Sequence, residues 1–412
     1  ELGDELWWKA VRHWLTKHRD KAVDTTQFIR AIEEATGRDL TPFFDQWVFR
    51  AGYPNLKLRW GWDKSKRKGE LWLLQTQDVS EKNPAFRFKA KVRVTGRGWT
   101  KTFYETVSAK EHRFNWTLPG EPLDVAFDPD YEVLCKAEFA KPLAMWQHQL
   151  AKGPKAVHRA LAAAQVSRWG GAKAVAALTA AVKRERYWGA AAEMVDALAG
   201  VSGEESLTAL RGLLKTLEHP KVRRAVVEAL GRRGDASDAR ALAPLARADK
   251  SLLVRAQATR ALGERGGKRF RGVIAANLKA KTYRDGVAAA AVSAVAASRD
   301  PKVVAQLAKL SLPPYRFGAR IAAVRALSGY ASASADAVPA LIKLLPEHDE
   351  RISLVVIAAL GGTGDERAIP ALERTKKETG NPRVRVYADE ALARLKAGGK
   401  TRSKLLPAAP KS

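Results

Sequence analysis

The second half of the chain contains an internal repeat, and this repeat limits the fold more than any other feature. An Ala-Leu or Ala-Val pair recurs at spacings of 32, 32, 33, 32, 33 and 32 residues. In the fuller unit, as in residues 222–235 and 352–365, an apolar helical pattern ends at a glycine and a second helical segment follows. A period of this length predicts paired helices that stack into a solenoid. The pairs begin at Ala197, Ala229, Ala261, Ala294, Ala326, Ala359 and Ala391.

The composition of the repeated unit indicates the type of solenoid. An earlier copy around Ala164 brings the number of units to about eight. The units resemble short HEAT-like repeats, and this resemblance implies a curved, all-α domain over residues 139–397. The following segment, residues 398–412, is rich in Gly, Lys and Pro, which predicts a disordered basic tail.

Between residues 53 and 138 the apolar period changes from helical to alternating. Leu56, Leu58 and Trp60 form one alternating row, and Val92 and Val94 form another. Six or seven short antiparallel strands of this kind predict a small β-sandwich. Turn compositions lie at 64–69, 79–84, 96–98 and 119–122, and the other inward positions are Trp62, Leu71, Leu73, Phe86, Phe88, Phe103, Phe114, Trp116, Val125 and Phe127.

Residues 1–52 predict three short helices, the first over residues 5–19. The second begins at a capping box formed by Asp24 and Gln27 and ends at Gly37. Helices of this total length are too small to form an independent core. We therefore expect them to pack against another domain, one that precedes them in the parent protein. The apolar faces comprise Leu6, Trp7, Ala10, Val11, Trp14 and Leu15 in the first helix, and Phe28, Ile29, Ile32 and Ala35 in the second.

The stretch over residues 37–54, which we call the hinge, joins these helices to the strands. Asp39 or Thr41 can cap a third helix, Pro42 suits its first turn, and Gly52 is expected to end it. We interpret this aromatic helix as a wedge between two bodies, and we expect exposed aromatic rings where one of those bodies is absent. Its predicted apolar face comprises Phe43, Phe44, Trp47 and Val48.

Length, charge and cysteine usage narrow the classes of function. At 412 residues the chain is long enough for two or three bodies. It contains no long uncharged apolar run, so no membrane partner is predicted. It begins inside a predicted helix without Met, so we expect it to be a piece of a longer protein. Of the net charge of +28, residues 139–412 contribute +25, from 48 basic and 23 acidic side chains. Cys135, the single cysteine, lies in an alternating pattern and is expected to be a buried structural thiol, which assigns no compartment.

The histidines of the chain form no catalytic or metal-binding motif. They supply neither HExxH nor a His/Cys zinc spacing, and no Gly-x-Ser-x-Gly elbow occurs. His13 and His18 are five residues apart, which places them on different helix faces. We interpret each histidine as solvated or as a capping group, and we predict no catalytic, cofactor-binding or metal-binding residue in this chain. The histidines are His13, His18, His112, His148, His158, His219 and His348.

The acidic clusters and one glycine-rich turn are alternative candidate sites. Residues 263–268 resemble a phosphate-binding loop, but three residues separate the glycines where four are required, and no Ser or Thr follows Lys268. The acidic groups lie beside predicted loops or on polar helix faces, which favours solvated carboxylates over a general acid–base pair. They are Glu33 with Glu34, Glu204 with Glu205, and Glu347 with Asp349 and Glu350.

The basic surplus of the solenoid suggests a binding function. Arginines from neighbouring repeats could line one stripe and hold phosphate backbones through counterion release. Against nucleic acid, these arginines fall at many helical phases, and only Trp146, Trp169 and Trp188 of the twelve tryptophans lie beyond residue 139. A generally basic, solvated surface is favoured, and an acidic protein or peptide partner would satisfy the same charge. The cluster comprises Arg223, Arg224, Arg232, Arg233, Arg255, Arg260, Arg265, Lys268, Arg269 and Arg271.

The first part of the chain resembles the end of the catalytic domain in the aminopeptidase N-like zinc metallopeptidases, the gluzincin aminopeptidases. The matching segments are residues 2–18, 25–40 and 43–58, and the last contains a distinctive FxxWxxxxGYPxL pattern. In that family a small β-sandwich and a superhelix of HEAT-like repeats follow, which is the order predicted here. The resemblance covers essentially the whole chain, with the repeats matched by architecture.

This resemblance implies a parent protein that uses zinc to hydrolyse N-terminal peptide bonds. The HExxH helix, its glutamate ligand, the Gly-x-Met-Glu-Asn loop and the catalytic tyrosine of the family lie before this chain, and no role carries over to Tyr53. Zinc and the peptide substrate are therefore expected in the parent, whereas this chain alone is predicted to be inactive, acting as a spacer and shaping access. The alternative is a non-enzymatic HEAT-repeat scaffold that binds an acidic protein or nucleic acid.

The predicted architecture is multidomain α+β. It comprises a short helical remnant of a catalytic domain, a small antiparallel β-sandwich, an all-α HEAT-like solenoid and a tail, over residues 1–52, 53–138, 139–397 and 398–412.

Overall fold

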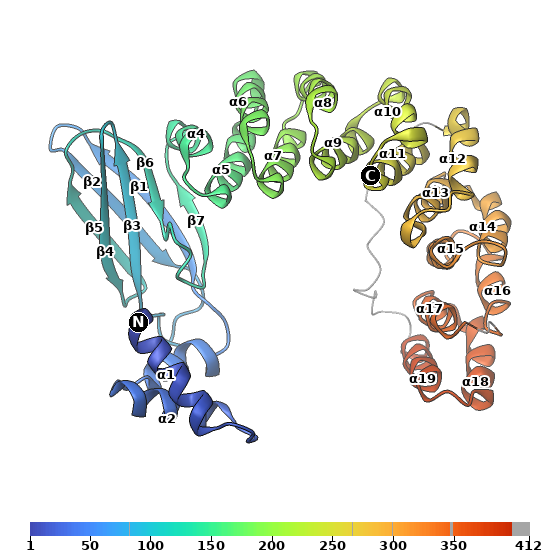
Figure 1. The fold of residues 1–412 in the computed structure, drawn as a ribbon, viewed down its shortest axis with the longest axis horizontal. Helices are drawn as coiled ribbons and strands as arrows, with labels where there is room; N and C mark the ends of the chain where they lie inside the picture. The colour runs from blue at the N-terminus through green and yellow to red at the C-terminus, as the bar shows by residue number, and fades with distance from the viewer. Residues whose placement is uncertain (82, 266, 299, 347–348, 398–412) are drawn as a thin grey trace. The chain divides into compact units, whose positions relative to one another are not determined.

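The structure is a computed structural model of the chain, and it describes every residue except 82, 266, 299, 347–348 and 398–412. It confirms the α+β class: short helices come first, two small sheets follow, and a long run of helices completes the described chain (Figure 1). The chain divides into two compact units, Glu1–Gln149 and Leu150–Ser412. The division falls inside helix α4, whereas the sequence placed the start of the solenoid at residue 139. The predicted tail lies outside the described residues.

Short helices open the first unit, and their ends follow the sequence signals. At the start of α2, Asp24 accepts a hydrogen bond from the Gln27 amide, and the Gln27 side chain accepts one from the Asp24 amide. At its end, Gly37 adopts the left-handed conformation, with φ 66°. The capping box and the glycine end are therefore confirmed. The elements are α1 (Gly3–Lys17), α2 (Thr25–Thr36), α3 (Thr41–Phe44) and the π-helical turn η1 (Asp45–Phe49).

The third helix begins and ends differently from the prediction. Its N-cap is Leu40, whose side chain has no hydrogen-bond acceptor. The Asp39 carboxylate accepts a hydrogen bond from the Thr41 amide at 2.9 Å, at the first residue of the helix. The helix does not run to Gly52. It widens into η1 and ends at Phe49.

The widening also changes which side chains share a face. A π turn advances fewer degrees per residue than an α-helix, so side chains after Phe44 leave the predicted row. Phe44 is buried, whereas Val48 is 50% exposed. The prediction of a single apolar face was wrong for this reason.

The N-terminal helices bury a small cluster of their own and pack on the sandwich. Ile32 and Phe44 belong to the buried cluster. The Trp47 ring packs on Phe86 of the sandwich, with ring centroids 5.4 Å apart. Gln46 donates to the Arg87 carbonyl at 2.8 Å and accepts from the Arg87 amide at 2.7 Å. The sandwich is therefore one neighbour of the hinge helix.

In the described part of the first unit, seven strands form two sheets, in the orders β5-β2-β1-β7 and β4-β3-β6. Burial alternates along β1 and β2, and their inward side chains meet those of β3 in one core that includes Leu58, Leu73 and Val92. Alternation places one face of each strand toward this core. The strands are β1 (Asn55–Asp63), β2 (Lys68–Gln75), β3 (Phe88–Gly96), β4 (Trp99–Val107), β5 (Glu111–Thr117), β6 (Pro122–Phe127) and β7 (Lys136–Ala140).

Two sequence expectations fail at the last strand. β7 pairs with β1 in parallel, with Leu56 opposite Ala137, so the four-stranded sheet is not purely antiparallel. Cys135 lies in the loop before β7 and is half-buried, not inside an alternating strand. Asp128 orders this loop, because its carboxylate accepts hydrogen bonds from the Glu132 and Val133 amides at 2.9 and 3.0 Å.

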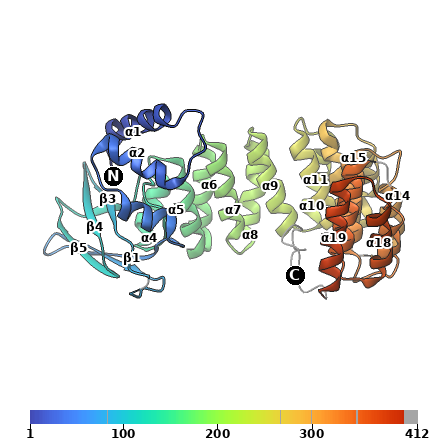
Figure 2. The same ribbon diagram turned by 90° about the horizontal axis from the view of Figure 1, so that it is seen from below.

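The second unit is a two-layered solenoid. Odd-numbered helices from α5 to α19 stack on one another in order, and even-numbered helices from α6 to α18 pack on them. Figure 1 shows the odd-numbered helices along the inner side of the curve, and Figure 2 shows the successive helices side by side. The helices are α4 (Leu143–Lys152), α5 (Ala156–Trp169), α6 (Gly171–Arg184), α7 (Trp188–Gly200), α8 (Glu204–Thr216), α9 (Pro220–Arg233), α10 (Ala236–Ala248), α11 (Leu252–Arg265), α12 (Arg271–Leu278), α13 (Gly286–Ala296), α14 (Val304–Leu310), α15 (Phe317–Gly329), α16 (Ala337–Ile342), α17 (Glu350–Gly361), α18 (Ile369–Glu378) and α19 (Pro382–Lys396), with the 3₁₀ turns η2 (Gly267–Phe270), η3 (Tyr283–Asp285), η4 (Pro301–Val303) and η5 (Glu366–Ala368).

The recurring alanines occupy equivalent places in the odd-numbered helices. Ala164 lies in α5, Ala197 in α7 and Ala391 in α19, and the alanines between them follow the same order. Each odd-numbered helix therefore carries one copy of the repeat, and α19, which packs on α18, is the last helix among the described residues. The repeat period read from the sequence is confirmed.

Of the repeat glycines Gly231, Gly263 and Gly361, only Gly361 ends its helix as predicted. α11 continues past Gly263 to Arg265, so this glycine does not end the helix. A Cβ placed on Gly263 would lie 2.6 Å from the Cβ of Ala294, the marker alanine of the next repeat. The glycine is required because two helices approach closely there. The equivalent pairs are Gly231 with Ala261 at 2.8 Å and Gly361 with Ala391 at 2.7 Å.

Among the described residues, no helix is both long and apolar enough to cross a membrane.

Candidate functional site: the apolar surface of the N-terminal helices

The histidines predicted from the sequence to be solvated or capping groups occupy different environments in the structure. His112 fits the capping interpretation, because it accepts hydrogen bonds from the Ser108 and Ala109 amides at 2.9 Å. His13 bonds Glu34 at 3.0 Å on a half-exposed surface. His158 departs from the expectation, since it is buried inside α5. His348 lies outside the described residues.

The acidic groups are engaged in structural contacts. Glu34 binds Lys17 at 2.5 Å, and the Lys17 hydrogen bond holds the Glu34 pKa below its ordinary value. Glu33 accepts a hydrogen bond from the Leu40 amide at 3.0 Å. Glu204 pairs with Arg211, while Glu347 is not described. Among the described residues, no group of three or more His, Cys, Asp or Glu side chains could hold a metal ion.

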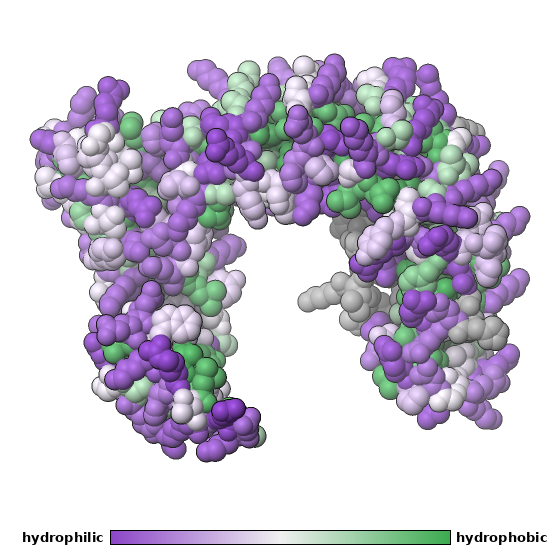
Figure 3. All heavy atoms as spheres, in the orientation of Figure 1, coloured by the Kyte–Doolittle hydropathy of each residue, from purple (hydrophilic) through white to green (hydrophobic). Residues whose placement is uncertain are grey.

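The feature that stands out in the first unit is instead its exposed aromatic surface. Phe43 is 40% exposed, whereas Phe44 is buried and Trp47 is partly covered by the sandwich core. The expected exposure of the hinge rings therefore holds for Phe43 and for part of Trp47. Figure 3 shows hydrophobic side chains gathered on the surface of the N-terminal helices. We use the name N-terminal apolar surface for the exposed large apolar side chains of residues 1–53, which lie on more than one helix face: Trp7, Trp8, Leu15, Val23, Phe43, Val48, Phe49 and Tyr53.

A groove of about 770 Å³ runs beside this surface, between the helices and the sandwich. Trp7 and Phe43 line one side, and the 70% exposed Tyr104 and the 66% exposed Leu134 line the other. Isolated exposed apolar residues are ordinary, but a groove lined by several aromatic rings marks a contact site.

Lysine and carboxylate groups lie at the rim of this groove. Lys91 binds Asp130 at 2.9 Å and Glu132 at 3.2 Å, and these hydrogen bonds raise the lysine pKa above its usual range. Lys91 also lies over the Tyr104 ring, with its Nζ 5.7 Å from the ring centroid. An apolar floor with a charged rim is the composition of a protein–protein interface.

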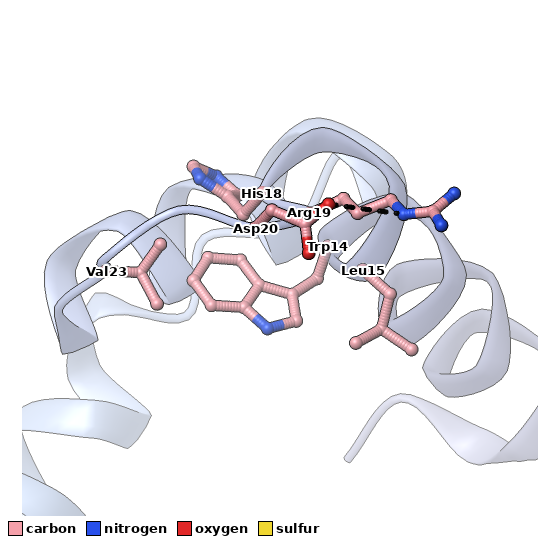
Figure 4. Close-up of a pocket in the computed structure, with 6 residues that line it drawn as sticks. All are labelled: Trp14, Leu15, His18, Arg19, Asp20 and Val23. Carbon is pink, nitrogen blue, oxygen red and sulfur yellow. Dashed lines mark ion pairs between the residues drawn. The ribbon is translucent and has the colours of Figure 1, made fainter.

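A second hollow, of about 440 Å³, lies at the end of α1 (Figure 4). Figure 4 shows the Trp14 indole between the side chains of Leu15 and Val23, while Arg19 and Asp20 form an ion pair of 3.5 Å above it. The His18 ring packs on Trp14, with centroids 4.4 Å apart. Leu15 is 62% exposed, so the apolar surface continues along α1 to this end.

Sequence reasoning missed several members of this surface. Trp8 and Phe49 are 55% and 56% exposed, but neither belonged to a predicted apolar face. Trp8 carries a usable signal, because it follows Trp7 in a helix and two adjacent tryptophans cannot face one core. Phe49 carries none, since its exposure follows from the π turn.

Most arginines of the predicted basic stripe serve the solenoid itself. Arg223 binds Asp249 at 2.6 Å. Arg233 and Arg265 lie one repeat apart and each donates to carbonyls at the end of the preceding odd-numbered helix, as in the 2.8 Å bond from Arg265 Nε to the Gly231 carbonyl. These bonds satisfy helix C-termini. The exposed members are Arg224, Arg232, Arg265, Arg269 and Arg271; the side chain of Lys268 is outside the described residues.

Cys135 is a poor candidate for chemistry. Burial and the neighbouring Asp128 carboxylate raise the pKa of its thiol to about 11. The thiolate is the nucleophilic form, so this thiol is unreactive at neutral pH.

Comparisons with known proteins identify the repeats of the solenoid and a structure with a similar fold. The family model for HEAT repeats matches residues 184–263 and 315–393. Among curated proteins, transcription initiation factor TFIID subunit 2 of Gallus gallus is 24% identical over 159 residues, and that of Danio rerio is 23% identical over 159 residues. Each match covers 31% of this chain and 13% of the relative.

Among solved structures, the chain is similar to the crystal structure of Legionella pneumophila aminopeptidase A in complex with aspartic acid. The TM-score is 0.59 at 14% sequence identity, and the similarity covers 95% of this chain and 55% of the aminopeptidase chain. The chain thus spans little more than half of that aminopeptidase. These findings show that the chain contains HEAT repeats and has the fold of part of an aminopeptidase.

Proposed function

We propose that this chain is the C-terminal region of an aminopeptidase-like protein, and that a preceding catalytic domain packs on the N-terminal apolar surface. The observation that carries the proposal is the exposure of Trp7, Trp8, Phe43 and Phe49 on the short N-terminal helices. The fold similarity over 95% of the chain supports it.

The energetics favour a covered surface. Burying a large apolar side chain stabilises a protein by roughly 1.5–3 kcal/mol relative to leaving it exposed. Trp7, Trp8, Phe43 and Phe49 are each between 40% and 56% exposed, so covering them would contribute roughly 1 kcal/mol apiece. A sum of several kcal/mol is large beside the total stability of a domain.

In the proposed parent, hydrolysis of N-terminal peptide bonds and zinc binding belong to the preceding domain. The described residues of this chain do not fit a zinc site, because no cluster of three possible ligands occurs among them. We therefore assign no step of hydrolysis to this chain. Its role in the proposal is to space the domains through the sandwich and to shape access to the active site through the solenoid.

Hydrogen–deuterium exchange tests the domain contact directly. The measurement compares this chain with the longer protein that includes the residues preceding it. We expect slower exchange in α1 and η1 of the longer protein, with unchanged exchange in β5, a sandwich strand that contributes no residue to the groove. Equal exchange of α1 and η1 in both proteins would contradict the proposed contact.

An activity measurement tests the division of labour. The purified chain is expected to cleave no aminoacyl reporter and to bind no stoichiometric zinc. Chelator-sensitive cleavage by this chain alone would refute the assignment of catalysis to the preceding domain.

The second candidate function is that of a non-enzymatic scaffold, which could describe either the whole parent protein or this region by itself. The similarity to a transcription initiation factor subunit favours it. The upstream reading frame discriminates between the two, because a peptidase requires HExxH with a further glutamate ligand downstream. Absence of that motif from the upstream frame would favour the scaffold.

A further inference from the structure

Exposed apolar side chains gather at one edge of the solenoid, where the odd-numbered helices begin. We call this the leading edge. Among the large exposed hydrophobic residues described in the second unit, only Trp169 ends an odd-numbered helix. The leading-edge residues that matter here are Tyr187 and Trp188 at α7, Leu252 and Leu253 at α11, Tyr283 before α13 and Phe317 at α15.

Most carboxylates at the leading edge are already paired with arginines of this chain. Glu185 binds Arg159 at 2.6 Å, and the nearly buried Asp249 binds Arg223 at 2.6 Å. Several exposed cations remain there with no carboxylate partner among the described residues. They are Arg247, Lys250, Lys279, Lys281 and Arg284.

Two of these cations, Arg247 and Lys281, line a hollow of about 460 Å³ between α10, α11 and α12, which we call the α11 pocket. Arg247, Arg255 and Lys281 line it, and no acidic side chain does. A pocket lined by three cations without a carboxylate attracts an anionic group.

Arg255 is held in position inside this pocket. Asn277, only 3% exposed, accepts a hydrogen bond from Arg255 Nη2 at 3.2 Å. The Asn277 amide in turn donates to the Ala246 carbonyl at 2.9 Å and to Thr259 Oγ1 at 2.8 Å. The Arg255 Nε is buried with no hydrogen-bond partner. This Nε is out of a ligand's reach, but the guanidinium that Asn277 positions in a cation-lined pocket suits a carboxylate or phosphate.

We propose that the α11 pocket and its surroundings bind an acidic peptide segment that also carries apolar side chains. A carboxylate of the peptide pairs with Arg255, between Arg247 and Lys281. Apolar side chains of the peptide cover Leu252 and Leu253, which lie in the same first turn of α11 as Arg255. This inference does not rest on the aminopeptidase-like assignment.

The apolar residues decide against nucleic acid as the occupant. Single-stranded nucleic acid binds through bases stacked on aromatic rings, and Leu252 and Leu253 offer no such ring. The ring of Trp188 is already covered, since Lys221 Nζ lies 3.7 Å from its centroid and the His219 ring stacks on it at 6.0 Å. Tyr283, 80% exposed, is the only open ring near the α11 pocket among the described residues.

Fluorescence anisotropy with the whole chain tests the proposal. The probe is a short labelled peptide rich in Asp and Glu that also contains Leu and Phe. We expect saturable binding that weakens with salt. Arg255→Gln is expected to weaken binding about tenfold or more, because a desolvated charge pair is lost. Lys281→Gln, at an exposed loop position, is expected to weaken it a few-fold without disturbing the fold.

Two controls test whether binding requires the charges of the α11 pocket and the apolar side chains of the probe. Arg240→Gln removes an exposed charge near the start of α10, at the opposite edge, and should leave affinity unchanged. A polyglutamate peptide lacks the apolar side chains and should bind more weakly than the probe. Equal binding of polyglutamate, equal loss with Arg240→Gln, or no binding at low salt would each overturn the proposal. Tighter binding of oligothymidylate with the same dependence on Arg255 would also overturn it, in favour of nucleic acid.

Discussion

The contact between Gly263 and Ala294 predicts how one added methyl group would change the stability of the solenoid. A Cβ at residue 263 would lie 2.6 Å from the Ala294 Cβ, about 1 Å closer than the optimal carbon–carbon distance. The backbone of Ala294 lies closer still, so no side-chain rotation relieves the clash. Helices α11 and α13 must therefore separate along their interface.

Two opposing effects determine the size of the change. Replacing glycine by alanine inside a helix stabilises it by about 1 kcal/mol. Overpacking of a close interface costs about 1–3 kcal/mol and occasionally more. We expect Gly263→Ala to lower the free energy of unfolding of the solenoid by up to about 2 kcal/mol, once both effects are counted.

Gly212 supplies a matched control. It lies in the last part of helix α8, and a Cβ placed there would meet no atom within 4 Å. Gly212→Ala should therefore raise the free energy of unfolding by about 0.5–1 kcal/mol. Urea denaturation followed by circular dichroism at the helical band measures both variants. If Gly263→Ala proved as stable as Gly212→Ala, the close approach of α11 and α13 would not be the reason for the glycine.

Three further predictions concern the charged and thiol groups. Cys135, with a thiol pKa of about 11, should react with iodoacetamide at pH 8 far more slowly in the folded chain than in urea; equal rates would contradict its burial. The Arg159 hydrogen bond holds the folded-state pKa of Glu185 below its ordinary value. The contribution of Glu185 to the free energy of unfolding is therefore complete at a pH above that ordinary value, and it is lost as the pH falls through the folded-state pKa. Glu185→Gln should accordingly cost about 1–3 kcal/mol at pH 7 and flatten the loss of stability in acid, measured by urea denaturation at several pH values; an unchanged acid profile would argue against the pair. Lys141 has a buried ammonium that bonds Asp124 at 2.5 Å and also donates to the Val125 carbonyl and the Gln149 side chain. Lys141→Met is expected to lower the free energy of unfolding by about 3 kcal/mol, and addition of Asp124→Leu should recover the part that belongs to the ion pair. Additive losses in the double variant would refute the coupling.

The sequence predicted the solenoid well because its signal is periodic and local. Alanines at equivalent positions recur once per helical pair, and a pair of this kind can bury its apolar face only by stacking on its neighbours. The capping box at Asp24 and the left-handed Gly37 were also readable, since each involves residues only a few positions apart. The strands of the sandwich followed from alternation in the same way.

The candidate surface was only partly predictable. The sequence identified Phe43 and Trp47 as hinge aromatics, but it placed Val48 on the same face and did not single out Phe49. A π turn is not encoded by a recognisable pattern in five residues, so the exposure of Phe49 required the folded backbone. The α11 pocket was not predicted, because Arg247, Arg255 and Lys281 come from three segments that meet only in the fold.

The sequence by itself determined the order of the parts, the repeat period and the alternation of the strands, because these depend on spacings along one segment. Only the tertiary structure decided which segments meet. It paired β7 with β1 in parallel, set Gly263 against Ala294, and turned Arg233 and Arg265 toward the carbonyls of the preceding repeat. These contacts join residues that are distant in the chain, and their choice follows from close packing and from the requirement that buried polar groups be satisfied.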